Sequence, residues 1–411
     1  MPDRPVVLVV SPGDETYRGY CLEQVAAAYD VVLLSAAEPT WETPFIVDHA
    51  VADPADPVAL LAAGRALAER HDLAGVLTWD EWNLVPTARL ARALGLASPS
   101  VEVMRGCRNK AVARTQFARH GVPSAASMTV RTLLEAGLAT MTLGYPAVIK
   151  PAAFAGSIGV RRIDGPEEIP AAYAFAAEGA GRSREDTSVL VEEYLDGPEV
   201  SVECVTFRGT TTVVAVTRKT LGEPPYFEEV AHTVDAADPL LEQVAPAAAA
   251  AVKALGITDG VSHVEMRLVD GRPRLIEVNA RIGGDMIGRL VHLATGVDLP
   301  RAAADIACGH APDLTPTRSR AAAIRMIYPA CSGTLTARHL PDHITRRPWL
   351  RACFLRDPGD EVTLPPQGDV DSARVGFLIT TGPSTAVAEV RLQEAYRSLT
   401  VAVTPHQKAA G

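Results

Sequence analysis

Residues 262–281 read SHVEMRLVDGRPRLIEVNAR, and this stretch decides how the rest of the chain is interpreted. Apolar and polar side chains alternate on both sides of a central Asp-Gly pair, which predicts two antiparallel strands joined by a tight turn. Residues two apart on a strand share a face, so Glu277 and Asn279 point together, and folding the hairpin back brings Glu265 near them. Burying two carboxylates and an amide in otherwise apolar strands is costly unless a cation neutralises them.

These oxygen-bearing side chains suit a hard divalent cation. Mg²⁺, or Mn²⁺, prefers oxygen ligands, and Mg²⁺ typically combines few carboxylates with the phosphates of a substrate. An interpretation of equal weight is an exposed strand face with solvated acids, because half-exposed strands often carry Glu. Arg281 and the pair Gly283-Gly284 follow directly. They would supply a fixed cation and a close backbone approach to an anion, although a glycine pair is also a common turn.

A candidate phosphate site precedes this hairpin in the chain. Lys150 ends a predicted apolar strand, and the loop Gly156-Ser157-Ile158-Gly159 comes shortly after it. A lysine point charge beside exposed backbone N–H groups suits phosphate, but the spacing is not that of a P-loop. Lys110 is similar, although either lysine taken alone is more often a surface residue.

Composition and charge limit the classes of function. The 411 residues are 47% hydrophobic and 21% charged, which is typical of a folded chain with two or three domains. The formal net charge of −10 argues against non-specific binding to nucleic acid or to anionic membranes. No apolar stretch is long enough to cross a bilayer. The six cysteines lie far apart, which predicts free thiols in a reducing cytoplasm and argues against a disulfide framework or a zinc site.

The order of predicted elements favours an α/β protein. In the first hundred residues short apolar runs alternate with amphipathic helices, as in a parallel sheet covered by helices. Residues 78–81, Thr-Trp-Asp-Glu, follow one of these strands, where ligand clefts form, but an acidic helix N-terminus is an equally good interpretation. Further predicted elements are hairpins centred on Arg208-Gly209 and Asp270-Gly271, helices at 109–120, 239–255 and 385–398, and strands at 322–328 and 373–380.

Several short motifs occur in one order along the chain, and that order resembles the ATP-grasp superfamily. The motifs are Asn109-Lys110, Gly121-Val122-Pro123, and residues 146–151 (PAVIKP), 156–159 (GSIG), 192–195 (EEYL), 197–199 (GPE), 262–265 (SHVE) and 276–281 (IEVNAR). The resemblance covers roughly residues 106–310 and implies an ATP-grasp fold. Its expected parts are a Rossmann-like parallel α/β domain (1–105), a two-lobed ATP-grasp domain (106–310) with a mobile lid lobe at about 125–190, and a C-terminal α+β domain (311–411).

The resemblance also implies a role for individual residues in binding ATP and a metal ion. Residues that would contact the ATP phosphates, directly or as a loop closing over them, are Lys110, Lys150, Gly156, Ser157 and Ile158. Residues that would line the adenine and ribose pocket are Glu192, the backbone of Glu193 and Leu195, and, for the ribose hydroxyls, Glu199. Residues that would hold Mg²⁺ or Mn²⁺ are Glu265, Glu277 and Asn279.

A narrower resemblance, to the dipeptide-forming branch of bacterial L-amino-acid ligases, comes from residues 218–221 (RKTL) and 224–232 (PPYFEEVAH). In that branch a Glu and a His three positions later face the substrates, and here these are Glu229 and His232. A Glu can hold an α-ammonium, and a His can bind a carboxylate, join a metal shell or handle a proton. The alternative is a Pro-rich surface loop with incidental acids. Other residues expected to face the substrates are Ser157, Arg281, Gly284 and Asp285.

The function implied by the resemblance is an ATP-dependent carboxylate–amine ligase. It would join two amino acids through an acyl phosphate and release ADP and phosphate, with ATP and amino acids as its small-molecule partners; a homodimer is compatible with the family. Residues expected to act in catalysis are Lys150, Glu229, His232 and Arg281. Two alternatives stay open: a carboxylase of the biotin or purine-pathway type that uses bicarbonate, and a nucleotide-binding regulatory protein with an inactive site. The residues do not identify the two amino acids or the carboxylate that is activated.

Overall fold

The computed structural model describes residues 4–406, and its first layer is the predicted parallel sheet. The strands are β1 (Val6–Val10), β2 (Asp30–Ser35), β3 (Asp48–Val51) and β4 (Leu73–Leu77), in the order β3-β2-β1-β4 and all parallel. The helices are α1 (Glu15–Ala26), α2 (Pro57–Arg70) and α3 (Leu84–Leu94). Alternate residues of β1 and β2 pack against α1 on one face and against α2 and α3 on the other, so β1 and the interior of β2 are apolar.

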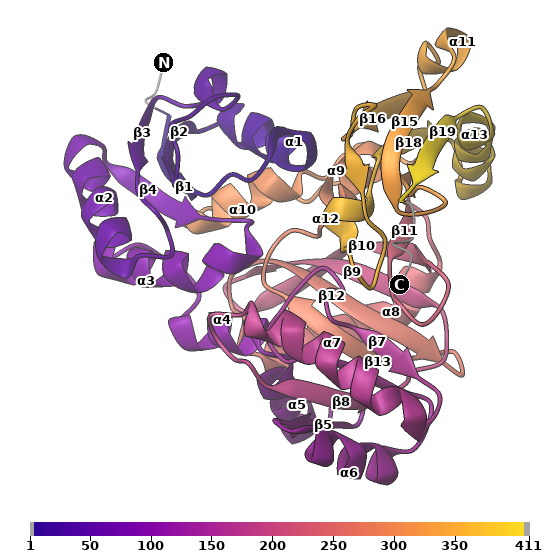
Figure 1. Cartoon of the computed structure of the whole chain (residues 1–411). Coiled ribbons are helices and arrows are strands. Elements are labelled where there is room, and N and C mark those ends of the chain that lie inside the picture. Colours follow the sequence, from indigo (N-terminus) through magenta and orange to yellow (C-terminus); the bar gives the residue numbers. More distant parts are fainter. Residues whose placement is uncertain (1–3, 407–411) are drawn as a thin grey trace.

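Two helices lead from this layer into the rest of the molecule. They are α4 (Val101–Arg108) and α5 (Lys110–Arg119), where the sequence predicted only a helix at 109–120. The side chain of Asn109 accepts hydrogen bonds from the backbone N–H groups of Ala111 and Val112, so it caps α5 and separates the two helices. The chain then forms a small lobe, residues 127–193, magenta in Figure 1.

The small lobe is a four-stranded antiparallel sheet with helices packed on it. Its elements are β5 (Ser127–Val130), α6 (Leu133–Leu143), β6 (Ala147–Pro151), β7 (Arg161–Ile163), α7 (Ile169–Gly181) and β8 (Val189–Glu193), with strand order β5-β8-β6-β7. Its core consists mainly of small and β-branched side chains from both helices and the sheet. The predicted Gly156–Gly159 loop leads from β6 toward β7 at the edge of this sheet.

A large antiparallel sheet of eight strands forms the centre of the molecule, in the order β13-β12-β9-β10-β11-β14-β18-β16 (Figure 1). Its strands are β9 (Glu199–Phe207), β10 (Thr210–Leu221), β11 (Glu229–Asp235), β12 (Gly260–Val269), β13 (Arg272–Asn279), β14 (Ala321–Ile327), β16 (Leu350–Phe354) and β18 (Gly376–Gly382). One face of its first strands packs on α8 (Leu240–Ala254), and the opposite face carries polar side chains. Both predicted hairpins are present as the pairs β9–β10 and β12–β13.

The C-terminal third extends this sheet and adds a smaller one. The other elements are α9 (Ile287–Thr295), α10 (Leu299–Ala307), β15 (Gly333–His339), α11 (Asp342–Thr345), β17 (Glu361–Val362), α12 (Val370–Ala373), α13 (Thr385–Arg397) and β19 (Thr400–Pro405). The strand predicted at 373–380 is wrong at its start, because Asp369 caps the short helix α12 and the strand begins only at Gly376. The sequence predicted a domain boundary at residue 310, and strands from before and after this residue belong to the same large sheet. Among the described residues no helix is both long and apolar enough to cross a membrane.

Candidate active site

A cavity that opens to solvent lies between the small lobe and the polar face of the large sheet. The predicted residues that line it are Lys110, Lys150, Gly156, Ser157, Ile158, Glu192, Glu193, Leu195, Glu199, Glu229, Glu265 and Glu277. A second cavity adjoins it, because the two share several lining residues. The predicted residues that line only this second cavity are Asn279, Arg281, Gly284 and Asp285.

The loop after β6 turns sharply over the first cavity. Gly156, Ser157 and Gly159 have positive φ angles of 70°, 56° and 76°. A side chain at Gly159 would place its Cβ 2.9 Å from a ring carbon of Pro151, so only glycine fits there. A tight turn of this kind can present successive backbone N–H groups to an anion.

Lys150 ends β6 inside the cavity wall and is almost completely buried. Its Nζ lies 2.6 Å from Oε2 of Glu192, and Arg114 donates from Nε and Nη2 to both oxygens of the same carboxylate at 2.8 and 3.0 Å. Burial lowers the pKa of Lys150 despite this carboxylate. Glu192, which was predicted to line the adenine pocket, thus lines the cavity with its charge already compensated by two cations.

The hairpin acids lie as the alternation predicted. Glu265 pairs with Glu277 and His263 with Asn279 across β12 and β13. Asn279 Nδ2 donates to Glu277 Oε1 at 2.9 Å, and the other oxygen of Glu277 lies 2.7 Å from Lys110 Nζ. Carboxylate and amide oxygens lining one cavity, with Lys110 against Glu277, form a donor set that fits a hard divalent cation.

The buried side chain of His263 contacts Glu265, one of the hairpin acids. His263 Nε2 lies 3.0 Å from Glu265 Oε1, and its Nδ1 lies 2.7 Å from Oε1 of Glu203, which is fully buried. Burial alone would lower the pKa of His263, but the two carboxylates raise it to about 10. Sequence reasoning missed Glu203, and the signal that could have found it is its position in register with His263 on β9, on the polar face of the sheet.

Lys219 on β10 is a second residue that sequence reasoning left without a role. Its Nζ lies 2.6 Å from Glu229, 3.1 Å from Glu265 and 3.3 Å from Glu199, and its side chain is fully buried. Burial alone would lower the pKa of Lys219, but the three carboxylates raise it well above its usual value. The ammonium of Lys219 therefore compensates the group of acids Glu199, Glu229 and Glu265, whose oxygens converge to within 4.8 Å.

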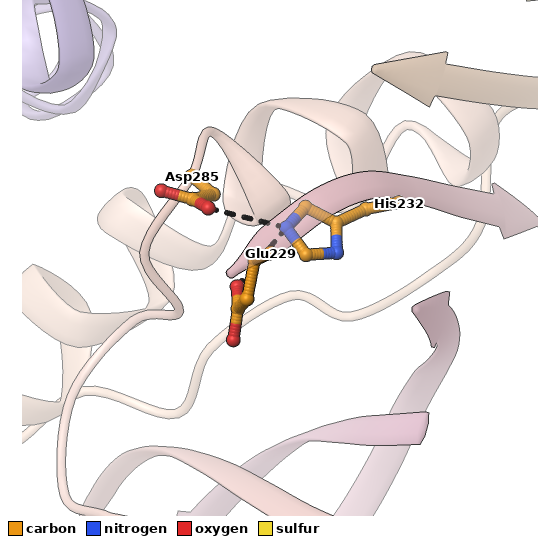
Figure 2. Close-up of side chains that lie close together, drawn as sticks. All are labelled: Glu229, His232 and Asp285. Carbon is orange, nitrogen blue, oxygen red and sulfur yellow. Dashed lines mark hydrogen bonds and ion pairs between the residues drawn. The ribbon is translucent and has the colours of Figure 1, made fainter. Parts of the chain in front are cut away.

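Glu229, His232 and Asp285 form a compact cluster beside the second cavity, and Figure 2 shows both carboxylates beside the His232 ring. His232 Nε2 lies 3.1 Å from Glu229 Oε2 and 3.3 Å from Asp285 Oδ2. Residues three apart on a regular strand face opposite sides, but β11 carries a bulge at Val230, since Ala231 pairs with Thr220 and Glu229 with Leu221. The bulge brings Glu229 and His232 to one side, so the alternative of a surface loop is wrong for these residues.

Arg374 binds Asp285, one of the carboxylates of this cluster. None of the sequence motifs predicted a role for Arg374. Arg374 donates from both terminal nitrogens to the two oxygens of Asp285, each at 2.6 Å, and its Nε donates to the hydroxyl of Tyr328 at 3.0 Å. Burial alone would raise the pKa of Asp285, but Arg374 and His232 lower it well below its usual value. Asp285 itself has a positive φ of 46° in the turn before α9.

Arg281, the predicted catalytic cation, is held from the N-terminal layer. Its Nε donates to Glu81 Oε2, and its Nη1 donates to the carbonyl of Ile282 at 2.9 Å. Glu81 lies in the short 3₁₀ helix Glu81–Asn83 after β4, which Asp80 caps by accepting from the N–H of Trp82. Both interpretations of residues 78–81 thus hold in part, since Asp80 is a helix cap and Glu81 reaches the site.

Comparisons with known proteins agree with this architecture. Residues 143–289 match the family model described as the ATP-grasp domain. The fold resembles that of the L-amino acid ligase from Bacillus licheniformis with a TM-score of 0.83 and 24% identity, over 98% of this chain and 100% of that one. The predicted ATP-grasp fold is therefore confirmed.

The sequence relatives point the same way. An uncharacterized protein, y4rH, from Sinorhizobium fredii is 28% identical over 84% of this chain and 72% of its own length. Carnosine synthase 1 from Homo sapiens is 28% identical over 59% of this chain, but the match covers only 31% of that protein. These relatives, together with the match of residues 143–289 to the ATP-grasp domain, agree with an ATP-grasp fold.

Proposed function

We propose that this protein is an ATP-dependent ligase that joins the carboxylate of one amino acid to the amine of another, releasing ADP and phosphate. The observation that carries the proposal is that two adjoining cavities are lined by the two lysines, the hairpin acids and Arg281, and that the Glu229–His232–Asp285 cluster lies beside the second one. A relative named carnosine synthase and a structural neighbour named L-amino acid ligase support the same class. The cytoplasmic location and a homodimer stay predictions.

The nucleotide would occupy the first cavity. Lys110 and Lys150 would hold its phosphates under the Gly156–Ile158 loop, and Glu193, Leu195 and Glu199 would line the adenine and ribose end. Glu265, Glu277 and Asn279 would hold Mg²⁺ or Mn²⁺, which when bound neutralises the charge of the phosphate oxygens. Because Lys110 already contacts Glu277, the phosphate site and the metal site share one charge network.

The amino-acid substrates would occupy the second cavity. Arg281 would orient the carboxylate that attacks the terminal phosphate and then steady the acyl phosphate until the amine displaces phosphate. Glu229 would hold an α-ammonium, while His232, fixed between two carboxylates, would orient Glu229 and Asp285. Ser157 and Gly284 line the same cavity and would form part of its walls around the reacting groups, which must be shielded from water.

The test is a matrix of amino-acid pairs incubated with ATP and Mg²⁺, read by phosphate release and by product mass. We expect ADP formation that requires two amino acids and a product whose mass equals their sum minus water. ATP hydrolysis that depends on bicarbonate and ignores amino acids would instead identify a carboxylase. Absence of turnover with every pair, in a protein that still binds ATP, would identify a regulatory protein with an inactive site.

A further inference from the structure

Arg108, the last residue of α4, connects three parts of the molecule that are far apart in sequence. Its side chain is almost completely buried, and its Nη1 lies 2.7 Å from Glu81 Oε1. Its Nε lies 3.2 Å from Oε2 of Glu185, in the segment between α7 and β8 of the small lobe. Glu81 uses its other oxygen to accept from Arg281. The four charged side chains therefore form a continuous series of ion pairs, from Glu185 through Arg108 and Glu81 to Arg281.

Neighbouring contacts join the same surfaces. Asn109 Nδ2 donates to Asp186 Oδ2 at 2.8 Å, and Lys110 Nζ donates to the carbonyl of Phe154 at 2.7 Å. The rings of Trp82 and Phe154 lie 4.8 Å apart, and the Arg108 guanidinium lies 4.7 Å from the centre of the Trp82 ring. Each contact to Asp186 or Phe154 has one partner in the small lobe and the other near the N-terminal layer. These contacts therefore exist only while the small lobe is in this position.

Glu81 is the carboxylate that links the two arginines of this series of ion pairs. Burial alone would raise the pKa of Glu81, but Arg281 and Arg108 lower it to about 2, so it is a carboxylate shared by two cations. Each of its oxygens faces one arginine. A change in the position of Arg108 must therefore change the position or the charge balance of the carboxylate that holds Arg281.

We propose that Arg108 is a positioning residue that couples docking of the small lobe, through Glu185, to the orientation of Arg281. The proposal rests on the ligase function proposed above, since Arg281 is the cation placed at the reacting phosphate. It adds a condition for activity: Arg281 is held in this orientation when the segment at Glu185 is docked against Arg108. Acid activation would then be favoured only beneath a docked lobe, which protects the acyl phosphate from water.

The first test compares Arg108→Gln with Arg105→Gln, an exposed arginine on the same helix. Glu81 keeps Arg281 as a partner in Arg108→Gln, so the variant is expected to fold. We expect kcat for ligation to fall about 10- to 100-fold in Arg108→Gln, because misplacing a reacting group is costly. KM for ATP should change less than about threefold, and Arg105→Gln should match the wild type. Arg108→Lys keeps the positive charge but lacks the several N–H donors of the guanidinium, so its kcat should lie between those of Arg108→Gln and the wild type.

A double-mutant cycle separates coupling from a structural role. Glu185→Gln should lower kcat in the wild type but have little further effect in Arg108→Gln, because the link is already broken. Additive losses would overturn the proposal. So would an equal fall of ATP affinity, melting temperature and kcat in Arg108→Gln, which would mean that the residue only stabilises the fold. An unchanged kcat would overturn it as well.

A second readout does not depend on the chemistry. Trp82 is half exposed and lies against both Arg108 and Phe154, so its fluorescence should change when a non-hydrolysable ATP analogue docks the small lobe. Trp82→Phe should remove this change, and Glu185→Gln should weaken it at saturating analogue. If the signal responds as expected but no amino-acid pair is ligated, the proposed function fails. If ligation occurs and the signal is insensitive to Glu185→Gln, the coupling fails.

Discussion

The two ends of the site differ in how they are built. The phosphate end uses Lys110, Lys150 and the hairpin acids, each in a short motif with its own local alternation or turn. The amino-acid end depends on pairs between distant segments, such as Asp285 with Arg374, and on a strand bulge. The comparison teaches that the proposed nucleotide site is encoded in local motifs, whereas the proposed amino-acid site depends on contacts made by the assembled fold.

The largest effect should come from Arg281→Ala, which removes the cation proposed to orient the reacting carboxylate. We expect ligation to fall about 10²–10³-fold, the scale of losing one electrostatic stabiliser of a transition state. The fold should persist, because Glu81 keeps its contact with Arg108. The measurement is amino-acid-dependent ADP release, with Arg272→Ala, an exposed residue of the same hairpin, as the control. Turnover like that of the wild type would refute the site.

The two buried lysines give the sharpest test of the comparison. Lys219→Met removes the only lysine ammonium that lies against Glu199, Glu229 and Glu265 in the described part of the chain, so the free energy of unfolding should fall by about 3–5 kcal/mol. Lys150→Met leaves Glu192 paired with Arg114 and should cost only about 1 kcal/mol.

The same pair should separate stability from nucleotide affinity. Lys150→Met should weaken ATP binding more than Lys219→Met does, because Lys150 lies at the predicted phosphate end. Urea titration and calorimetric ATP binding measure the two quantities, and Lys253→Met on the exposed face of α8 serves as the control. Equal stability losses in the two buried-lysine variants would contradict the assignment of Lys219 to a charge-compensating role.

Much of the phosphate end could be predicted from sequence for a physical reason. Strand periodicity alone places Glu277 and Asn279 on one face, and a strand-end lysine followed by glycines is recognisable without tertiary contacts. The partners of these residues could not be predicted. Arg281 meets Glu81 and Asp285 meets Arg374 across long sequence separations, and no periodicity carries that information.

The bulge in β11 is the clearest example of a feature that could not be predicted from the sequence. Regular alternation would place Glu229 and His232 on opposite faces, and only the register against β10 shows otherwise. The sequence resemblance nonetheless placed both residues at the substrates without explaining how a strand could do so. The start of α5 was predictable, because the helix predicted at 109–120 begins at the asparagine that caps it, but α4 directly before it was not predicted.

A smaller and more selective effect is expected at the amino-acid end. His232→Ala should lower kcat/KM for the amino acids about 10- to 100-fold, the scale of one or two lost charge-assisted hydrogen bonds. Binding of ATP should change little, because His232 does not line the nucleotide cavity. Initial rates at varied amino-acid concentration measure kcat/KM, and calorimetry with ATP measures the affinity for ATP. Equal losses in both would count against a role of His232 at the substrates.

The smallest expected effect is the dependence of stability on pH that His232 contributes. Burial alone would lower its pKa, but hydrogen bonds to Asp285 and Glu229 raise it above the ordinary value of 6.5. A raised pKa in the folded state means that protonation stabilises the fold, fully below the unfolded pKa, and that this contribution is lost as pH rises through the folded pKa.

The difference in unfolding free energy between the wild type and His232→Gln should therefore be larger at pH 6 than at pH 9. Every tenfold tightening of proton binding by the folded protein adds about 1.4 kcal/mol to this difference. Urea titrations at a series of pH values measure it, and His120→Gln on the exposed end of α5 should show no such trend. A difference that grows toward high pH would mean that His232 is neutral in the fold, and Glu229 and Asp285 would then be held by Lys219 and Arg374 alone.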